Sequence, residues 1–266
     1  MNPGIYTDIT NEQYHSSAGI SRSGITRFNR SPFHYWNDYL KPSRANKEPT
    51  LSMILGEALH SYVLENSKFT RRYLISDKVD RRTSAGKEYI ANLESIRNNR
   101  IIIDTDEFKK IELMAEQISN TLLAKGIIDE ANYESSMFWN DPETGVLCKS
   151  RPDIIHNNMI VDLKTTNDAH SDVFKYSIRE YGYHIQAAMA IDGQSIIGTL
   201  SGKQINHNKF IIIAVENKEP YACAVYILHE DTISAGREIY KSCLPLYKKC
   251  LEENVWPSYQ ANVIRI

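Results

Sequence analysis

Residues Arg151–Lys164 read RPDIIHNNMIVDLK, a pattern typical of a β-hairpin with apolar strands. Asn157-Asn158 suits a two-residue turn, because asparagine tolerates the positive φ angles that tight hairpins need. A turn centred there pairs His156 with Met159, and each step outward pairs the next two residues. The stretch therefore predicts two antiparallel strands in a defined register.

Three charged side chains lie on this hairpin. The register places Asp153 opposite Asp162, and side chains directly opposed across two strands lie roughly 5 Å apart, so two carboxylates there repel each other. Lys164 is two residues beyond Asp162 and points to the same face of its strand. A fold tolerates such a pair when a divalent cation neutralises it, which predicts a magnesium site beside a lysine. Taken singly, Asp153 also suits a turn, and Asp162-x-Lys164 also suits a surface ion pair.

The overall composition is that of an ordinary soluble protein. The chain has 266 residues, of which 42% are hydrophobic and 24% charged, enough to bury a proper core. No stretch approaches the roughly 20 apolar residues of a membrane span. The N-terminus has neither the basic region nor the apolar region of a signal peptide. We therefore expect a cytoplasmic protein that does not enter a membrane.

Charge is distributed unevenly along the chain. The formal net charge is −2, yet residues 68–100 carry nine Lys and Arg against four Asp and Glu. Residues 1–47 carry six against three. A locally basic surface can attract a polyanion, although solvated helix faces produce the same counts. The four cysteines include no C-x-x-C pair and are expected to be reduced thiols; an iron–sulfur cluster stays the alternative.

Periodicity and capping residues predict an α/β fold. Ser21 is a candidate N-cap, and Asp104 with Glu107 resembles a capping box. Helices are expected over about 22–38 with a break at Ser31-Pro32, after an N-cap at Ser52, and over about 84–98, 104–125, 169–180, 184–198 and 230–254. Strands are expected over 133–140, 146–156, 159–166, 209–216 and 221–229. We predict a single domain, 1–266, with a helical N-terminal portion (about 1–130) and a sheet-bearing core (about 131–266) built on a mixed central β-sheet.

These motifs resemble a known family. Pro152-Asp153 followed by Asp162-Leu163-Lys164 is similar to the signature of PD-(D/E)XK nucleases. Gly56-x-x-x-His60 and Gln186 resemble two further motifs of the RecB-like branch of that superfamily. The resemblance narrows to the nuclease domain of RecE, exonuclease VIII. It is carried by residues 17–36, 56–60 with 64–65, 81–87, 134–136, 141–145, 148–153 and 183–186.

The resemblance implies the PD-(D/E)XK core fold and a specific activity. RecE-like enzymes are magnesium-dependent exonucleases that degrade linear double-stranded DNA in the 5′→3′ direction and leave 3′ single-stranded tails. They come from phages or prophages, form ring-shaped homo-oligomers and act with a single-strand annealing protein in recombination. Two Mg²⁺ ions per site are expected, and an imidazole ligand would let Mn²⁺ substitute.

The resemblance also assigns roles to residues. The metal ligands would be His60, Asp153, Asp162 and the carbonyl of Leu163. The catalytic residues would be Lys164, which orients or activates water, Gln186, which supports the site, and Glu134 on the neighbouring strand. A lowered pKa of Lys164 is expected in a cationic site. His60, on an apolar helix flank, also suits a hydrogen-bonded core histidine.

One position departs from the family pattern. The family's glutamine is often followed four residues later by tyrosine, but Ala190 occupies that position. The contribution of that tyrosine must be absent here or supplied elsewhere, for which Tyr183 is a candidate.

Four residues are candidates for binding DNA. Ser21, Arg22 and Ser23 lie at the expected start of a helix, where backbone N–H groups and an arginine can bind a terminal 5′-phosphate. Arg151 is expected on the same face as Asp153, within reach of the DNA backbone. Helix capping by Ser21 and solvation of Arg22 are the plainer explanations of these residues.

Two other functions fit the same motifs. One is an endonuclease or a single-strand nuclease with the same fold and metals. The other is an inactive module that binds DNA ends, against which the intact Asp153, Asp162 and Lys164 argue.

Overall fold

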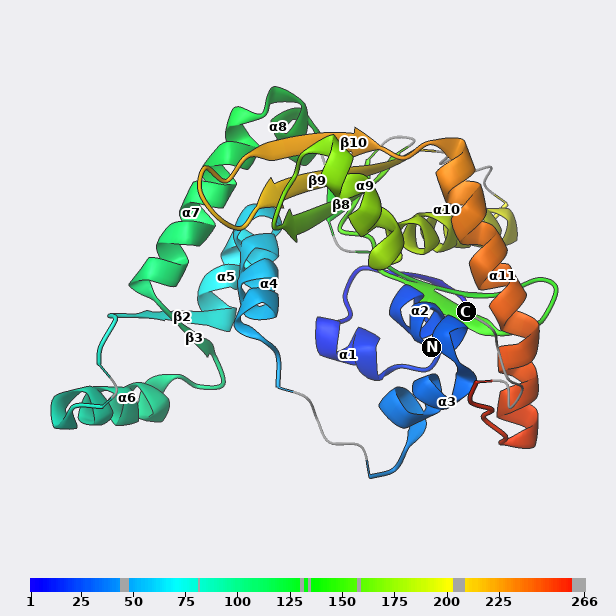
Figure 1. Cartoon of the computed structure of the whole chain (residues 1–266), viewed down its shortest axis with the longest axis horizontal. Coiled ribbons are helices and arrows are strands. Elements are labelled where there is room, and N and C mark those ends of the chain that lie inside the picture. Colours follow the sequence, from blue (N-terminus) through cyan, green and yellow to red (C-terminus); the bar gives the residue numbers. More distant parts are fainter. Residues whose placement is uncertain are drawn as a thin grey trace, which may run out of the picture.

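The computed structural model describes residues 1–43, 48–80, 82–129, 132–133, 135–156, 159–202 and 209–259 (Figure 1). The helices are α1 (Asn11–Ser16), α2 (Arg22–Arg30), α3 (Pro32–Tyr35), the π-helical turn η1 (Trp36–Leu40), α4 (Leu51–Leu64), α5 (Asn66–Arg72), α6 (Ser84–Ile96), α7 (Thr105–Asn120), α8 (Leu122–Asp129), α9 (Ser171–Glu180), α10 (Tyr183–Leu200) and α11 (Glu230–Glu253). The strands are β1 (Gly4–Tyr6), β2 (Tyr73–Ser76), β3 (Ile101–Asp104), β4 (Asn132–Tyr133), β5 (Ser136–Asn140), β6 (Leu147–Ser150), β7 (Ile154–His156), β8 (Met159–Thr166), β9 (Lys209–Glu216) and β10 (Cys223–Ile227).

The largest sheet among the described residues has five strands in the order β10-β9-β8-β7-β4. Strands β8 and β9 run parallel, and the other neighbouring pairs are antiparallel. The prediction of a mixed central sheet in an α/β fold is therefore confirmed. The parallel connection from β8 to β9 passes through α9 and α10, as crossovers between parallel strands require.

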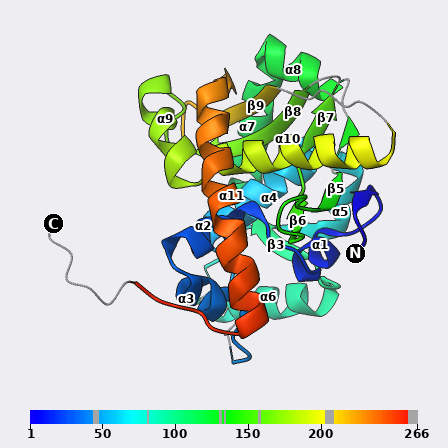
Figure 2. The same cartoon turned by 90° about the vertical axis from the view of Figure 1, so that its right-hand side faces the viewer.

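Alternation along β8 and β9 separates two apolar cores. Ile160 and Ile212 point to the face covered by α10 and α11, which cross each other in Figure 2. Val161 and Ile213 point to the opposite face, covered by α4 and α7. Successive strand residues point to opposite faces, so Asp162 shares the face of Ile160. The sequence position of Asp162 thus directs its carboxylate towards α10.

Two smaller sheets complete the fold. Strands β1, β5 and β6 form an antiparallel sheet, and β2 pairs with β3 in parallel. The single strands predicted over 133–140 and 146–156 are wrong, because each divides between this first small sheet and the central sheet. In the second case the reason is Pro152, which has no N–H for a ladder and restricts the backbone of Arg151.

The hairpin register is confirmed in part. His156 pairs with Met159, as predicted, and the ladder continues to Ile154 opposite Val161. It ends there, so the predicted pairing of Asp153 with Asp162 is wrong: Asp153 follows Pro152 and lies outside the strand. The turn predicted at residues 157–158 lies outside the described residues.

Helix boundaries follow the capping chemistry. Ser21 caps α2, and Asp104 with Glu107 forms the predicted capping box at α7. The predicted cap at Ser52 is wrong, because the hydroxyl of Thr50 accepts the hydrogen bond from Met53 N at 3.3 Å. The helix expected to reach residue 125 ends at Asn120, and α8 follows. Across the described ranges, none of the helices combines the length and apolar character needed to cross a membrane.

Candidate active site

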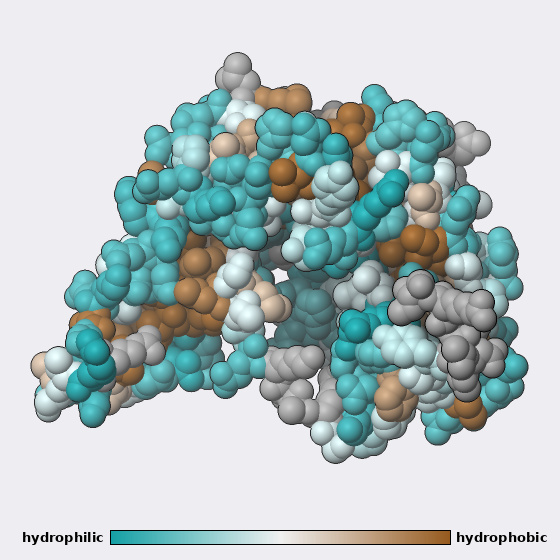
Figure 3. Space-filling view, in the orientation of Figure 1, coloured by the Kyte–Doolittle hydropathy of each residue, from teal (hydrophilic) through white to brown (hydrophobic). Residues whose placement is uncertain are grey.

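A cavity of about 840 Å³ opens between the α4 side of the molecule and α1 and α2. The hollow is visible near the centre of Figure 3, with hydrophilic side chains at its depth. Residues of α1, α2, α4, β8, α9 and α10 line it. The N-terminal helices and the C-terminal sheet-bearing core therefore build its walls together.

Asp162 is the most deeply buried acid in this cavity. Its residue surface is 1% exposed. Gln186 Nε2 donates a hydrogen bond of 2.7 Å to Asp162 Oδ1, and Lys164 forms an ion pair with Oδ2. Burial raises the pKa of Asp162, which the ammonium of Lys164 opposes. The carboxylate is held by a strand neighbour and by a helix on the same face of the sheet.

Lys164 is held in its charged form. Burial alone would lower the pKa of Lys164, but the carboxylates of Asp162 and Asp153 outweigh that effect and raise the pKa. Acids outweigh the cation Arg22 around this amine, so the lowered pKa expected for a site that holds metal cations stays a prediction. The ring of Tyr183 lies 5.3 Å from Lys164 Nζ, within cation–π distance.

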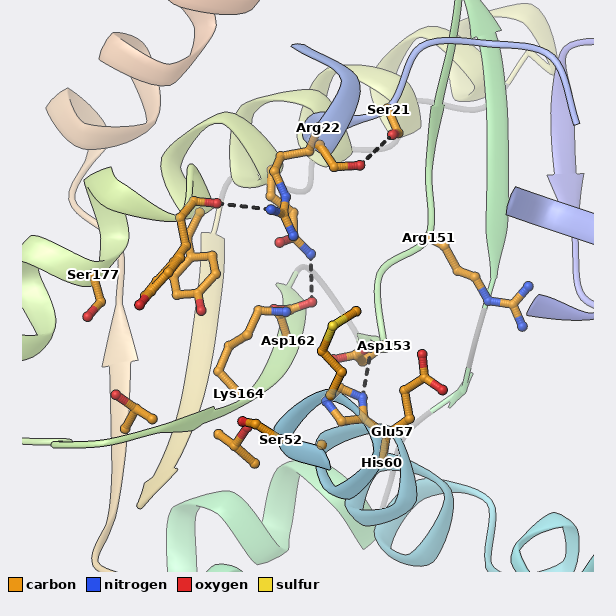
Figure 4. A pocket seen from close by; sticks show the side chains of 18 of the residues that line it. Ser21, Arg22, Ser52, Glu57, His60, Arg151, Asp153, Asp162, Lys164 and Ser177 are labelled. Carbon is orange, nitrogen blue, oxygen red and sulfur yellow. Dashed lines mark hydrogen bonds and ion pairs between the residues drawn. The ribbon is translucent and has the colours of Figure 1, made fainter. Parts of the chain in front are cut away.

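Asp153 reaches the site from outside the strand ladder. Its Oδ2 accepts a hydrogen bond of 2.7 Å from Leu163 N, and its Oδ1 lies 3.4 Å from His60 Nδ1 on α4 (Figure 4). Burial would raise the pKa of Asp153, but His60 and Lys164 outweigh it and hold the pKa at about 2. Burial alone would lower the pKa of His60, but the attraction and hydrogen bond to Asp153 outweigh burial and raise the pKa.

The donor set suits a hard divalent cation. Carboxylates and a carbonyl are the ligands that Mg²⁺ prefers, and His60 adds a nitrogen that Mn²⁺ accepts. Within the described ranges, however, no three His, Cys, Asp or Glu side chains are grouped closely enough to hold a metal ion. Lys164 contacts Asp162 Oδ2, and His60 contacts Asp153 Oδ1. Gln186 Oε1 is buried without a hydrogen-bond partner among the described residues, so one acceptor in this wall is unused.

The start of α2 lies across the cavity from these acids. Ser21 Oγ lies 3.5 Å from the backbone N–H of Gly24, which it caps, and 3.0 Å from Ser23 Oγ. Arg22 Nη1 donates a hydrogen bond of 3.0 Å to Tyr181 O. The three predicted phosphate-binding residues are therefore brought to the same cavity as Asp153 and Asp162.

Arg151 does not reach the carboxylates. Its guanidinium donates to Ile9 O at 3.1 Å and to Ser136 Oγ at 2.9 Å, and it extends away from Asp153 in Figure 4. These contacts tie the end of β6 to the N-terminal segment. Its contact with DNA stays a prediction. Glu134 lies outside the described residues, so its predicted role stays untested.

The position that departs from the family pattern is buried. Ala190 lies on α10 itself and points into the core. Tyr183, one turn before Gln186, instead brings an aromatic ring to Lys164.

No motif pointed to Lys149, which also lines the cavity. Lys149 is 5% exposed, and its ammonium donates to the carbonyls of Tyr14, His15 and Ser17 at 2.8, 3.3 and 2.6 Å. Burial lowers the pKa of Lys149 to about 8. It caps the last turn of α1 from a strand more than 130 residues away, a pairing that no local pattern encodes.

A solved structure shares this fold. A provisionally named exonuclease from Eubacterium rectale superimposes with a TM-score of 0.61 at 17% identity, covering 94% of this chain and 88% of its own. A phage-related exonuclease from Haemophilus somnus gives a TM-score of 0.35 at 13% identity, covering 68% and 92%. Among curated proteins, no sequence matches the chain.

A family model covers nearly all of the chain. It spans residues 21–265 and describes a PDDEXK-like domain of unknown function, DUF3799. The acids, the lysine and the glutamine at one end of a mixed sheet agree with that description. The chain therefore belongs to the DUF3799 family of PDDEXK-like domains.

Proposed function

We propose that this protein is a metal-dependent exodeoxyribonuclease that hydrolyses linear double-stranded DNA from the 5′ end. The observation that carries the proposal is one cavity with two walls: Asp153, Asp162 and Lys164 on one side, and the start of α2 on the other. Phosphodiester hydrolysis needs a group that handles water and charge at the phosphate, and a group that positions the strand. Membership of a PDDEXK-like family supports the same reaction class.

Each residue around Asp153 and Asp162 has a role in this proposal. Asp153, whose pKa is about 2, is a carboxylate at neutral pH, and Gln186 orients Asp162 through the bond to Oδ1. Lys164 carries an ammonium that can donate to the phosphate or to the attacking water. Two Mg²⁺ ions, with Mn²⁺ as a substitute, would be held by His60, Asp153, Asp162 and the Leu163 carbonyl after the side chains move closer together than they lie here. When bound, such ions supply Lewis-acid stabilisation of charge on the phosphate.

Strand polarity would come from the α2 wall. Backbone N–H groups at a helix N-terminus and an arginine bind phosphate together. Arg22 also lies close enough to Lys164 to oppose its protonation, so a terminal phosphate at Arg22 would lie near the acids. Ser21 and Ser23 add hydroxyl donors at the same end of the helix.

An assay on end-labelled duplexes tests the proposal. Linear DNA labelled separately at each 5′ and 3′ end, with and without a 5′-phosphate, would be incubated in Mg²⁺, in Mn²⁺ and in chelator. We expect metal-dependent release of 5′-terminal nucleotides first, faster from phosphorylated ends. Release from the 3′ end first would contradict the polarity.

Closed circular DNA separates the alternatives. Efficient cutting of a closed circle would show an endonuclease, and faster digestion of single strands would show a single-strand nuclease. If the protein released no nucleotides in metal and Lys164→Ala behaved identically, the inactive end-binding module would be the better description.

The biological setting follows from the RecE resemblance. We propose that the 3′ tails serve recombination through a single-strand annealing protein of the same phage or prophage, and that the chain, as one domain, assembles into a ring around DNA. Sedimentation at working concentration is expected to show an oligomer; a stable monomer would contradict the ring.

A further inference from the structure

We infer that Tyr181 is a base-stacking residue that receives the terminal base of the DNA strand whose 5′-phosphate lies at Arg22. The inference rests on the proposed function and adds how the protein binds the terminal base of the strand. Tyr181 is 50% exposed and lines the cavity that contains Asp153 and Asp162. An aromatic face open to a nuclease cavity suits a nucleobase, which has a π-face whatever its identity.

The backbone fixes Tyr181 beside Arg22. Arg22 Nη1 donates to Tyr181 O at 3.0 Å. The next residue, Gly182, has φ +69°, and a Cβ added there would lie 2.7 Å from Thr26 Oγ1 and 3.5 Å from Arg22 Cδ. Only glycine permits this approach, so the turn between α9 and α10 packs directly on α2. A phosphate bound at Arg22 would therefore lie next to Tyr181, which lines the same cavity.

A second ring connects Tyr181 to Lys164. The centroid of Tyr183 lies 5.8 Å from that of Tyr181, with 37° between the ring planes. Tyr183 is 8% exposed, and its ring lies 5.3 Å from Lys164 Nζ. The rings thus run inward from the open one to the one that contacts the lysine. The outer ring is the one with a face available for a base.

The chemistry matches the substrate class. Stacking tolerates every base, whereas a set of hydrogen-bonding groups would select one. An exonuclease must accept each new terminal base in turn, so an aromatic contact paired with a phosphate contact suits it. The cationic Arg22, which donates to the Tyr181 carbonyl, complements the phosphate of the same nucleotide.

Tyr176 provides a matched control. It lies on α9 and is 67% exposed, but it does not line the cavity. If the exposed tyrosines on α9 and in the turn after it merely solvate the surface, substitutions of Tyr176 and Tyr181 have the same effect.

The experiment measures end binding without catalysis. Duplexes with a 5′-phosphate and 2-aminopurine at the first or the fifth base of that strand are titrated in chelator with wild type, Tyr181→Ala, Tyr181→Phe and Tyr176→Ala. We expect wild type to quench the first-position probe selectively. Tyr181→Ala should weaken end binding about tenfold and lose that quenching, whereas Tyr181→Phe and Tyr176→Ala should behave like wild type. Circular dichroism melting confirms that each variant is folded.

Two results distinguish a failure of the stacking role from a failure of the proposed function. If wild type releases nucleotides in Mg²⁺ and binds ends, but Tyr181→Ala quenches and binds as wild type does, the stacking role is wrong and the nuclease proposal stands. If wild type neither binds ends nor releases nucleotides, the proposed function fails and the stacking role with it.

Discussion

The two walls of the cavity hold their side chains in different ways. In the carboxylate wall, defined as His60, Asp153, Asp162, Lys164 and Gln186, charged groups contact one another across strands and helices. In the phosphate wall, defined as residues 21–23 and Tyr181, side chains are half-buried or exposed, and the anchoring bond goes to a backbone carbonyl.

The difference matches what each wall has to do. Reacting groups must be held within about 0.5 Å of their working geometry, which needs supporting side chains. Groups that engage a substrate end must keep donors and faces available for it. We therefore expect changes in the carboxylate wall to lower the rate, and changes in the phosphate wall to weaken binding of DNA ends.

The largest difference between the effect on nuclease activity and the effect on end binding is expected for Asp162→Asn. The amide keeps the shape of the side chain but removes the charge that a divalent cation needs, so nuclease activity should fall by at least about 10³-fold, several kcal/mol of transition-state stabilisation. End binding in chelator should change less than about threefold. Nucleotide release and fluorescence anisotropy measure the two quantities.

Asp168→Asn is the matched control for that variant. Asp168 also lines the cavity, but its carboxylate accepts from His170 N outside the carboxylate wall, so activity should stay near that of wild type. If Asp162→Asn lost end binding as strongly as activity, the division between the two walls would be wrong.

A pH effect of about 3 kcal/mol is expected from Lys149. Burial lowers the pKa of Lys149 from 10.5 to about 8, so folding carries a penalty for the buried charge below pH 8. Between about pH 8 and 10.5 the folded lysine has lost its proton and the unfolded one has not. The free energy of unfolding of wild type should therefore rise relative to that of Lys149→Met over this window.

Urea denaturation of both proteins at pH 7.5, 9 and 10.5 measures that difference. Lys87→Met, at an exposed position, is the control and should show no such change. If the difference in free energy of unfolding between wild type and Lys149→Met stayed constant with pH, the lowered pKa of the buried lysine would be contradicted.

A smaller rate effect is expected for Gln186→Ala. Asp162 Oδ1 would lose its donor at 2.7 Å, so the carboxylate would no longer be oriented. Residues that orient metal ligands typically contribute 10- to 100-fold, and we expect that fall in kcat with little change in end binding. Ser195→Ala, exposed on the same helix, should match wild type. An effect on KM alone would place Gln186 in binding instead.

The smallest effect is expected for Ser21→Ala. Loss of the cap on α2 should reduce the free energy of unfolding by about 0.5–1 kcal/mol, at the low end because Ser21 Oγ lies 3.5 Å from Gly24 N. The preference for 5′-phosphorylated ends should fall about twofold. Thr83→Ala removes the same kind of cap from α6, away from the cavity, and should change stability without changing that preference. If both variants had the same preference for 5′-phosphorylated ends, Ser21 would act only as a helix cap.

Much of the fold was predictable because it depends on neighbours in the chain. The apolar, β-rich runs over 159–166 and 209–216 predicted β8 and β9. The capping box at Asp104 and the break at Ser31-Pro32 were predicted because a side chain acts on backbone groups within three or four residues. The split of residues 146–156 into β6 and β7 was missed, although Pro152 signals it, because one strand was predicted across the proline.

The site was predictable to the level of its residue types. The motif around Asp162 and Lys164 indicated a cation site, and the structure brings His60, Asp153, Asp162, Lys164 and Gln186 together. The geometry was not predictable: Asp153 leaves the strand and bonds to Leu163 N, and Arg151 turns to Ile9, 142 residues away in the chain.

The sequence by itself determined which residues share a face of a strand or cap a helix, since those relations depend only on spacing along a regular backbone. Only the tertiary structure decided that α2 and the α9–α10 turn lie against each other, that Lys149 reaches the end of α1, and that two walls enclose one cavity. Such contacts join residues more than 100 positions apart. Their distances are set by how helices pack on the two faces of the central sheet, and packing depends on the summed shape of many side chains, which no short pattern contains.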